Sequence, residues 1–375
     1  MQASSMKEPW RLIVPLLAGG LLPITCSPAA SFVQEAQVPA FLTGRIQTIG
    51  SAGDGLSERL EQAARDAKGS DYFTVYLFES RHKIRCHSEG RTGEQYLVQA
   101  RGSTIHIRAG VSEGHDGYTT NEDDDTPAPA GLLLLHDRSG AVTDASVLDP
   151  DQRYKFAETP VYWLGIAGNE ESVDVVEAAF AGSPSADLKN TLLFIASSHR
   201  GARGRAFLKE VALGQDVSSV REKAVFWLGC FADPGSLGDL MEIYGRENSE
   251  HVRKQIVFAV SLNKSSEATS QLVVFARNDA DREIRKTAVF WLGQRASAEC
   301  VKALRDIVED DSSGLKEQAV FAISQLPKSQ SVPMLIEIAK TNASASVRKK
   351  AIFWLGQTGD ELALKFFEDI LVPQE

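Results

Sequence analysis

Phe290-Trp291-Leu292-Gly293 decides the fold, because it recurs along the chain at a fixed spacing. Three stretches repeat it almost unchanged: Tyr162-Trp163-Leu164-Gly165, Phe226-Trp227-Leu228-Gly229 and Phe353-Trp354-Leu355-Gly356. Weaker copies without Trp lie between them: Phe194-Ile195-Ala196-Ser197, Phe258-Ala259-Val260-Ser261 and Phe321-Ala322-Ile323-Ser324. These seven copies of an aromatic phrase begin at positions 162, 194, 226, 258, 290, 321 and 353, and so lie 31 or 32 residues apart. A fixed period of about 20 to 50 residues is typical of a solenoid, whose units bury their apolar faces against one another.

The residues around each copy predict two helices per repeat. The run 220–229 leaves little of its helix surface polar, so this helix must be sandwiched between neighbours. A second helix is expected at 237–244, and its equivalents have apolar residues at helical spacing in the segments 299–309, 332–339 and 362–370. The glycine that ends each Trp copy suits a helix end or a close helix crossing. We therefore expect a HEAT-like, all-α solenoid of about seven two-helix repeats over residues 152–375.

The segment before the repeats, residues 40–150, predicts a small α/β module rich in strands. One helix is expected at 56–64, and strands are expected at 72–78, 95–99, 104–108, 131–136 and 141–148. The acidic loop 114–130 contains contiguous aspartates, which lack the alternating spacing of a calcium loop. The predicted fold class is α+β overall, with this module followed by the solenoid.

Residues 1–30 have the pattern of an export signal peptide, with cations followed by a short apolar run at 12–24. That run is too short to span a membrane comfortably, so we expect no stable span in the mature chain. We expect a periplasmic or extracellular protein. Lipid anchoring at Cys26 is the alternative, although Pro23 and Thr25 occupy places where lipoprotein signals usually carry Leu and a small residue.

The composition limits the class of partner. The net charge of −10 argues against a nucleic-acid binder, since such proteins neutralise phosphates with Lys and Arg. A hydrophobic content of 43% is ordinary for a soluble globular chain. Beyond Cys26, the three cysteines at 86, 230 and 300 are scattered and odd in number, so no disulfide framework is expected.

The segments 284–294 and 347–357 carry the pattern Val/Ile-Arg-Lys-x-Ala-Val/Ile-Phe-Trp-Leu-Gly-Gln. This pattern resembles the short HEAT-like repeats named after phycobilisome bilin lyases. With its signal segment and β-rich module, the whole chain looks like the secreted bacterial HEAT-repeat proteins. The resemblance implies the solenoid fold, whereas these repeats serve scaffolds, lyases and a metal-dependent hydroxylase alike.

The motifs of the enzymes that contain such repeats are not found in this sequence. The deoxyhypusine hydroxylases hold two irons with repeated His-Glu pairs, and this sequence contains no His-Glu dipeptide. Within the repeats only His199 and His251 occur, at different registers, so no di-iron site is expected. No motif specific to the bilin lyases transfers either.

One cation lies five residues before each phrase aromatic from the second copy onward. We call this set the cation ladder: Lys189, Arg221, Arg253, Arg285, Lys316 and Arg348. Its members either bond an Asp or Asn of an adjacent repeat or form a basic stripe that binds a partner. The acids and amides available for the first role are Asp216, Asn248, Asp279 and Asp311.

The four phrase tryptophans also have two interpretations. They could present aromatic faces to a peptide or glycan. However, the intervening copies place the smaller Ile195, Ala259 and Ala322 at the same register. Large residues that alternate with small ones are typical of interdigitated packing, so we expect the tryptophans to lie in the core.

The module contains four candidates for a metal site: His82, Cys86, His106 and His136. A metal needs three or four convergent ligands, and His82 and Cys86 would share a strand face that His87 does not. The chain also contains no glycine loop for phosphates. We therefore expect no cofactor and no catalysis, and predict a monomeric scaffold or adaptor whose partner is a protein. The alternative is an enzyme or metal carrier with its site in the module or at its junction with the repeats.

Overall fold

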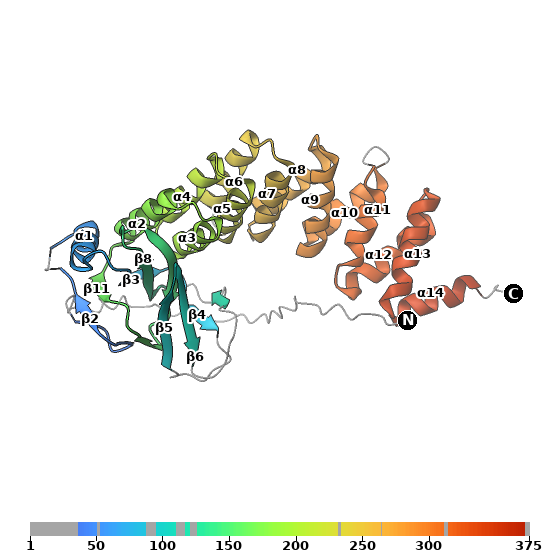
Figure 1. The fold of residues 1–375 in the computed structure, drawn as a ribbon. Coiled ribbons are helices and arrows are strands. Elements are labelled where there is room, and N and C mark those ends of the chain that lie inside the picture. The colour runs from blue at the N-terminus through green and yellow to red at the C-terminus, as the bar shows by residue number, and fades with distance from the viewer. Residues whose placement is uncertain are drawn as a thin grey trace, which may run out of the picture. The chain divides into compact units, whose positions relative to one another are not determined.

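The computed structural model describes residues 37–50, 53–87, 95–109, 117–120, 126–231, 234–263, 265–310 and 314–371. The expected signal peptide at 1–30, Cys26 and the acidic run 121–125 lie outside these ranges. A small β-rich module is followed by helices in repeats (Figure 1), so the predicted fold class is confirmed.

The module is built from two main sheets and one helix, α1 (Leu56–Asp66). Its strands are β1 (Leu42–Thr43), β2 (Ile46–Thr48), β3 (Tyr72–Ser80), β4 (Ile84–His87), β5 (Gln95–Arg101), β6 (Thr104–Ala109), β7 (Gly117–Thr120), β8 (Ala128–His136), β9 (Val142–Leu148), β10 (Arg153–Phe156) and β11 (Val161–Ile166). One sheet has the order β1-β10-β5-β6, the other β2-β11-β3-β8-β9, and β4 pairs with β7. The predicted helix and the hairpins β5–β6 and β8–β9 are confirmed.

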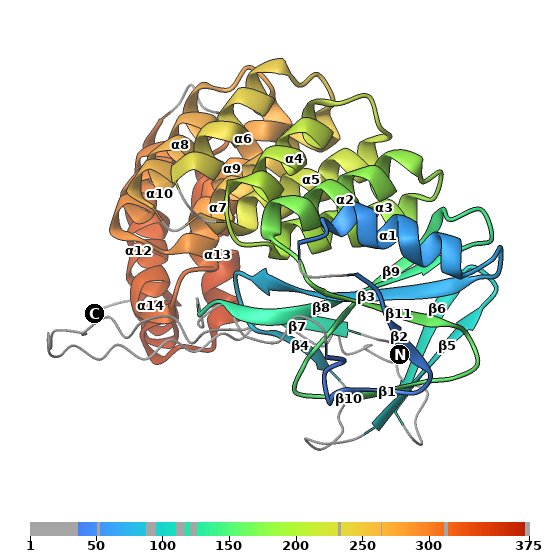
Figure 2. The ribbon, with the colours of Figure 1, turned by 90° about the vertical axis from the view of Figure 1, so that its left-hand side faces the viewer.

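The five-stranded sheet is buried on both faces. Side chains alternate along a strand, so Tyr76 and Phe78 of β3 pack toward the helices, while Phe73 and Val75 pack against the four-stranded sheet. Helices α1, α2 and α3 cover the first face (Figure 2). One apolar cluster runs from this face into the repeats. The module and the first repeats therefore share a single core.

The first phrase copy, at 162–165, is not a repeat helix, and our prediction was wrong there. It lies in β11, between β2 and β3 in the five-stranded sheet. Pro160 lies two residues before its aromatic, where it would break a helix, and Ala157 stands where the later copies have a cation. The helical array therefore begins at Asn169, beyond the boundary of 152 that we expected.

Thirteen helices follow β11 in the described residues. They are α2 (Asn169–Gly182), α3 (Ala186–Ser198), α4 (Ala202–Leu213), α5 (Ser218–Cys230), α6 (Pro234–Arg246), α7 (Glu250–Leu262), α8 (Ser266–Asn278), α9 (Arg282–Arg295), α10 (Ala298–Glu309), α11 (Lys316–Ser324), α12 (Lys328–Thr341), α13 (Ala345–Thr358) and α14 (Glu361–Leu371). The odd-numbered ones from α3 to α13 each carry a phrase copy, and we call them the phrase helices. Each packs on the next, and the even-numbered helices flank them (Figure 1).

Glycine sets the distance between neighbouring phrase helices. A Cβ atom added to Gly229 of α5 would lie 2.8 Å from the Cα atom of Ala259 in α7. One added to Gly293 of α9 would lie 2.7 Å from the carbonyl oxygen of Ala322 in α11. The copies with Trp supply the glycine, and the weaker copies without Trp supply the alanine. The expected close crossing is therefore confirmed, and it explains why the two kinds of copy alternate.

We expect Gly293→Ala to lower the free energy of unfolding by about 1 to 3 kcal/mol, because the added methyl group forces α9 and α11 apart. Gly238→Ala is the matched control, since Gly238 also lies inside a helix but has no atom within 4 Å of an added Cβ. The control should be neutral or stabilising by up to about 1 kcal/mol. Urea unfolding followed by circular dichroism measures both, and equal effects would contradict the packing role of Gly293.

Candidate functional site

The phrase helices bring their aromatic rings into one continuous row. Phe194 of α3 packs on Trp227 of α5 with ring centroids 5.1 Å apart, and the same contact recurs between later helices. We call the whole set the aromatic row: Phe194, Phe226, Trp227, Phe258, Phe290, Trp291, Phe321, Phe353 and Trp354. Consecutive centroids in it are 4.6 to 6.4 Å apart. A single apolar strip thus crosses six helices.

The row lies at the surface of the core and not within it. Leu228 and Val225 of α5 are fully buried, whereas Trp227 is only partly buried, and so are Trp291 and Trp354. Phe353 is 53% exposed. Our expectation that the tryptophans belong to the core therefore holds fully only for Trp163, which lies between the two sheets. In the phrase helices, each ring of the aromatic row packs on the next ring and is also partly exposed to solvent.

Polar side chains border the row and differ from repeat to repeat. Residues three and four positions before a phrase aromatic share its helix face. They are Asn190 and Thr191, Glu222 and Lys223, Lys254 and Gln255, Lys286 and Thr287, Glu317 and Gln318, and Lys349 and Lys350. The Lys223 ammonium lies 5.8 Å from the centroid of the Phe226 ring. In α9, a hydrogen bond from Lys286 holds the pKa of the Glu283 carboxyl below its usual value. The row is uniform, whereas its border is specific to each repeat.

The first three members of the cation ladder pair with acids of the following repeat. Lys189 lies 2.5 Å from Asp216, and Arg253 lies 3.3 Å from Asp279. Arg221 forms its ion pair with Glu247, the residue before the expected Asn248. These acids lie just before the next phrase helix. The expected structural role therefore applies to these three cations.

The other three members donate to backbone carbonyls of their own repeat. The guanidinium of Arg285 donates to the carbonyl of Asp279 at 2.6 Å, and that of Arg348 donates to Asn342 at 2.7 Å. Lys316 donates to the carbonyl of Glu309 at 3.3 Å. Lys316 also lines a cavity of about 460 Å³ near the start of α9, α11 and α13. The expected partner Asp311 lies outside the described ranges.

A second set of ion pairs joins the flanking helices, and our sequence analysis missed it. Arg277 of α8 lies 2.6 Å from Asp306 of α10, and Arg305 lies 2.9 Å from Glu337. Lys209 of α4 lies 2.8 Å from Asp239 of α6. The partners are about one repeat period apart, so opposite charges at that spacing were the available signal. These pairs occupy the flanking helices, whereas the aromatic row occupies the phrase helices.

The four metal candidates come from separate elements of the module. His82 lies after β3, His106 is partly buried in β6, and the side chain of Cys86 falls outside what the structure describes. His136 ends β8, where its Nδ1 donates to the carbonyl of Gly140 and its Nε2 lies 2.9 Å from the Thr74 hydroxyl. The described residues contain no group of three or more potential metal ligands.

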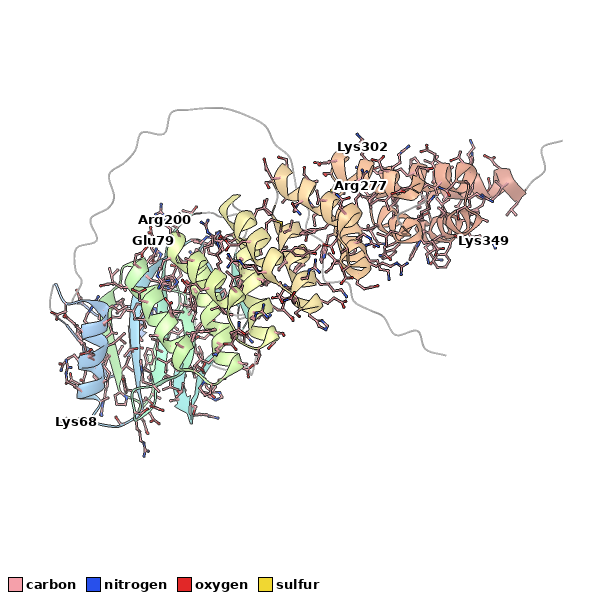
Figure 3. All side chains as sticks on the ribbon, turned by 90° about the horizontal axis from the view of Figure 1, so that it is seen from above. Lys68, Glu79, Arg200, Arg277, Lys302 and Lys349 are labelled. Carbon is pink, nitrogen blue, oxygen red and sulfur yellow. The ribbon has the colours of Figure 1, made fainter. Side chains whose placement is uncertain are left out.

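A series of buried hydrogen bonds links the five-stranded sheet to the first repeats. His199 follows α3 and is fully buried, with its Nδ1 donating to the carbonyl of Ile195 at 2.8 Å. Its Nε2 therefore accepts from the hydroxyl of Ser172 at 2.7 Å, and that hydroxyl oxygen lies 3.1 Å from the phenol oxygen of Tyr76. Residues from β3, α2 and α3 are thus joined through one neutral imidazole. Nearby, Arg200 forms an ion pair of 2.9 Å with Glu79 of β3 (Figure 3).

Burial keeps both core histidines neutral. It lowers the pKa of His199 from 6.5 to about 4, although the bond to Ile195 opposes the shift. Burial also lowers the pKa of His136 to about 4. A charged imidazole would lose its hydration shell at either place. Neither ring has a free nitrogen with which to act on a ligand.

Residues 269–356 match the family described as HEAT repeats. Among solved structures, human deoxyhypusine hydroxylase in complex with glycerol is 20% identical, with a TM-score of 0.24 over 55% of this chain and 80% of that one. The CpcE–CpcF complex of phycocyanin lyase from Nostoc is 16% identical, with a TM-score of 0.30 over 52% and 80%. A designed armadillo repeat protein is 21% identical, with a TM-score of 0.26 over 52% and 98%. No curated protein matches the chain by sequence.

The helical part of the chain is a HEAT-like repeat array, so the resemblance drawn from the sequence is confirmed at the level of fold. The identities are too low for the solved structures to assign an activity to this chain. No helix within the described ranges is both long and apolar enough to cross a bilayer.

Stability should fall as the pH drops from about 6.5 toward about 4, because the unfolded chain then protonates His199 while the folded chain does not. This lowered pKa corresponds to a loss of about 2 kcal/mol between pH 7.5 and pH 5. The variant His199→Gln should be less stable at pH 7.5 and should lose less on acidification than the parent chain. Urea unfolding at both pH values measures the difference, and equal losses would contradict the role given to His199.

Proposed function

We propose that this protein is an exported, non-catalytic scaffold or adaptor that binds another protein along its phrase helices. The observation that carries the proposal is the aromatic row, which extends across six helices while remaining partly open to solvent. Repeat arrays use such extended surfaces to hold partners. The export signal pattern at 1–30 supports a periplasmic or extracellular site of action in a bacterium.

The aromatic row and the polar residues that border it have different roles in binding. Aromatic rings supply contact area at low conformational cost, so the row supports affinity for a long apolar or extended segment. The bordering side chains change charge from Glu222 in α5 to Lys349 in α13 and therefore support selectivity along the segment. The flanking helices have charges paired across repeats and carry no part of the aromatic row. We therefore assign partner binding to the phrase-helix face and propose that the protein acts as a monomer.

Photocrosslinking can test this assignment. A benzoylphenylalanine should capture the partner in the native envelope when it replaces Lys223, Gln318 or Lys349, which border the row. The same group at Arg277 or Lys302 of the flanking helices is the matched control and should capture little (Figure 3). Mass spectrometry of the crosslinked bands measures the capture.

Equal capture from both sets of positions would contradict a face-specific scaffold. Capture from the flanking helices alone would assign binding to the opposite set of helices. Replacing Phe258 with Ser should weaken capture at Gln318, since it interrupts the row between α5 and α9.

A further inference from the structure

Basic residues are concentrated on the phrase helices in the later part of the array. Helices α9, α11 and α13 contain eight Lys and Arg residues and two acidic residues, Glu283 and Glu317. The flanking helices α10, α12 and α14 contain five basic and seven acidic residues. In the loop before α9, Asp279 pairs with Arg253, and Asp281 accepts a hydrogen bond from the amide of Glu283. These phrase helices are therefore basic, although the chain has a net charge of −10.

Three of these cations line one cavity beside the aromatic row. Arg282, Lys286 and Lys316 contribute to the wall of the cavity of about 460 Å³ at the start of α9, α11 and α13. Glu317 is the one acid among the described residues that line it. Arg282 and Lys286 lie eight and four positions before Phe290, so all three share one face of α9. The cavity therefore lies on the phrase-helix face, one to two helical turns from the Phe290 ring.

The surroundings of Glu283 show that this part of the array stabilises a carboxylate. The Lys286 ammonium lies 2.7 Å from the Glu283 carboxylate, and their hydrogen bond lowers the pKa of that carboxyl. The charges of Lys254 and Arg282 lower this pKa further. The Arg282 guanidinium itself donates to the carbonyl of Gly314 at 3.2 Å, a neutral acceptor that leaves its charge in place. A cavity lined mainly by one sign of charge attracts the opposite charge, here a carboxylate.

The aromatic row supplies an apolar surface next to this cavity. Phe290 and Phe321 stack with ring centroids 6.4 Å apart, and both are partly exposed. Residues of an extended segment are about 3.3 Å apart, so near neighbours within one segment can reach both the rings and the cavity. A nucleic acid would need cations along the whole row, whereas the border in α3 and α5 contains one cation, Lys223, beside Glu222. The charges and rings together fit a protein segment that is both acidic and apolar.

We propose that the cavity and the rings of Phe290 and Phe321 bind an extended segment of the partner protein in which acidic residues lie next to Phe or Leu. The carboxylates accept charge-assisted hydrogen bonds from Arg282 and Lys286, while the apolar residues pack on the rings. The proposal rests on the proposed function in taking a protein bound along the phrase helices as the partner. It adds the chemistry of the segment that binds between α9 and α13.

A labelled peptide that repeats Asp-Asp-Phe is the probe, and it should bind the full chain saturably in fluorescence anisotropy. The double variant Arg282→Glu, Lys286→Glu should weaken binding about ten-fold or more, because it replaces attraction by repulsion at the cavity. The matched control is Lys302→Glu, Lys328→Glu, which makes the same change in net charge on α10 and α12. It should bind within about two-fold of the parent chain, since charges away from the contact are screened by salt.

The apolar half of the site has its own variant. Phe290→Ser should weaken binding about ten-fold, because it removes a ring from the contact. Circular dichroism melting establishes that each variant is folded. Lys286→Gln removes one charge without reversing it and should weaken binding about three-fold, so the test stands even if the double variant does not fold.

Absence of saturable binding would overturn the proposal, as would equal weakening by the cavity variant and its control. Displacement of the peptide by a single-stranded oligonucleotide or by phosphatidylglycerol vesicles would also overturn it, because the site would then bind polyanions in general. Crosslinking from Gln318 in the envelope is a separate measurement. Capture that persists unchanged in the Arg282→Glu, Lys286→Glu variant would overturn this proposal and leave the scaffold in place. Charge-dependent peptide binding without capture along the row would instead contradict the scaffold alone.

Discussion

The close contact between a glycine of one phrase helix and an alanine of the next is the constraint on which the array depends. At Gly229–Ala259 and Gly293–Ala322 the two backbones approach so closely that a methyl group has no room. This approach buries the aliphatic residues of the phrase, whereas Phe226, Trp227 and their equivalents pack side by side at the surface of the core. The contact that stabilises the array therefore also creates the aromatic row.

The apolar helix faces at the two ends of the described array differ in what covers them. At the first repeats, the five-stranded sheet supplies the cover, and the Tyr76–Ser172–His199 chain fixes its position without introducing a charge. Helices α13 and α14 have no such cover among the described residues, and their aliphatic side chains meet solvent. A sheet can therefore meet the same packing requirement as a neighbouring helix.

Local patterns predicted much of the fold. Helical and strand periodicity identified α1, the hairpins β5–β6 and β8–β9, and the phrase helices. The cation ladder was recognisable from its register: three of its six members pair with an acid of the following repeat, and two of these acids are the expected ones. The copy at 162–165 was misassigned because identical residues favour a strand once Pro160 precedes them and β2 and β3 lie on either side. Parallel pairing of β10 and β11 with strands far away in the sequence leaves no local signal.

The sequence by itself determined the repeat, its period and the small residue at each crossing, because helix packing within a solenoid involves neighbours at a constant separation. Only the tertiary structure decided which phrase residues are buried, since Trp291 packs on Phe258 of the preceding phrase helix and yet remains partly exposed. It also decided the exposure of Ile352, because that depends on which helices lie beside α13 and not on the residue itself. Chemically equivalent positions, such as Val289 and Ile352, therefore differ in exposure through their neighbours alone.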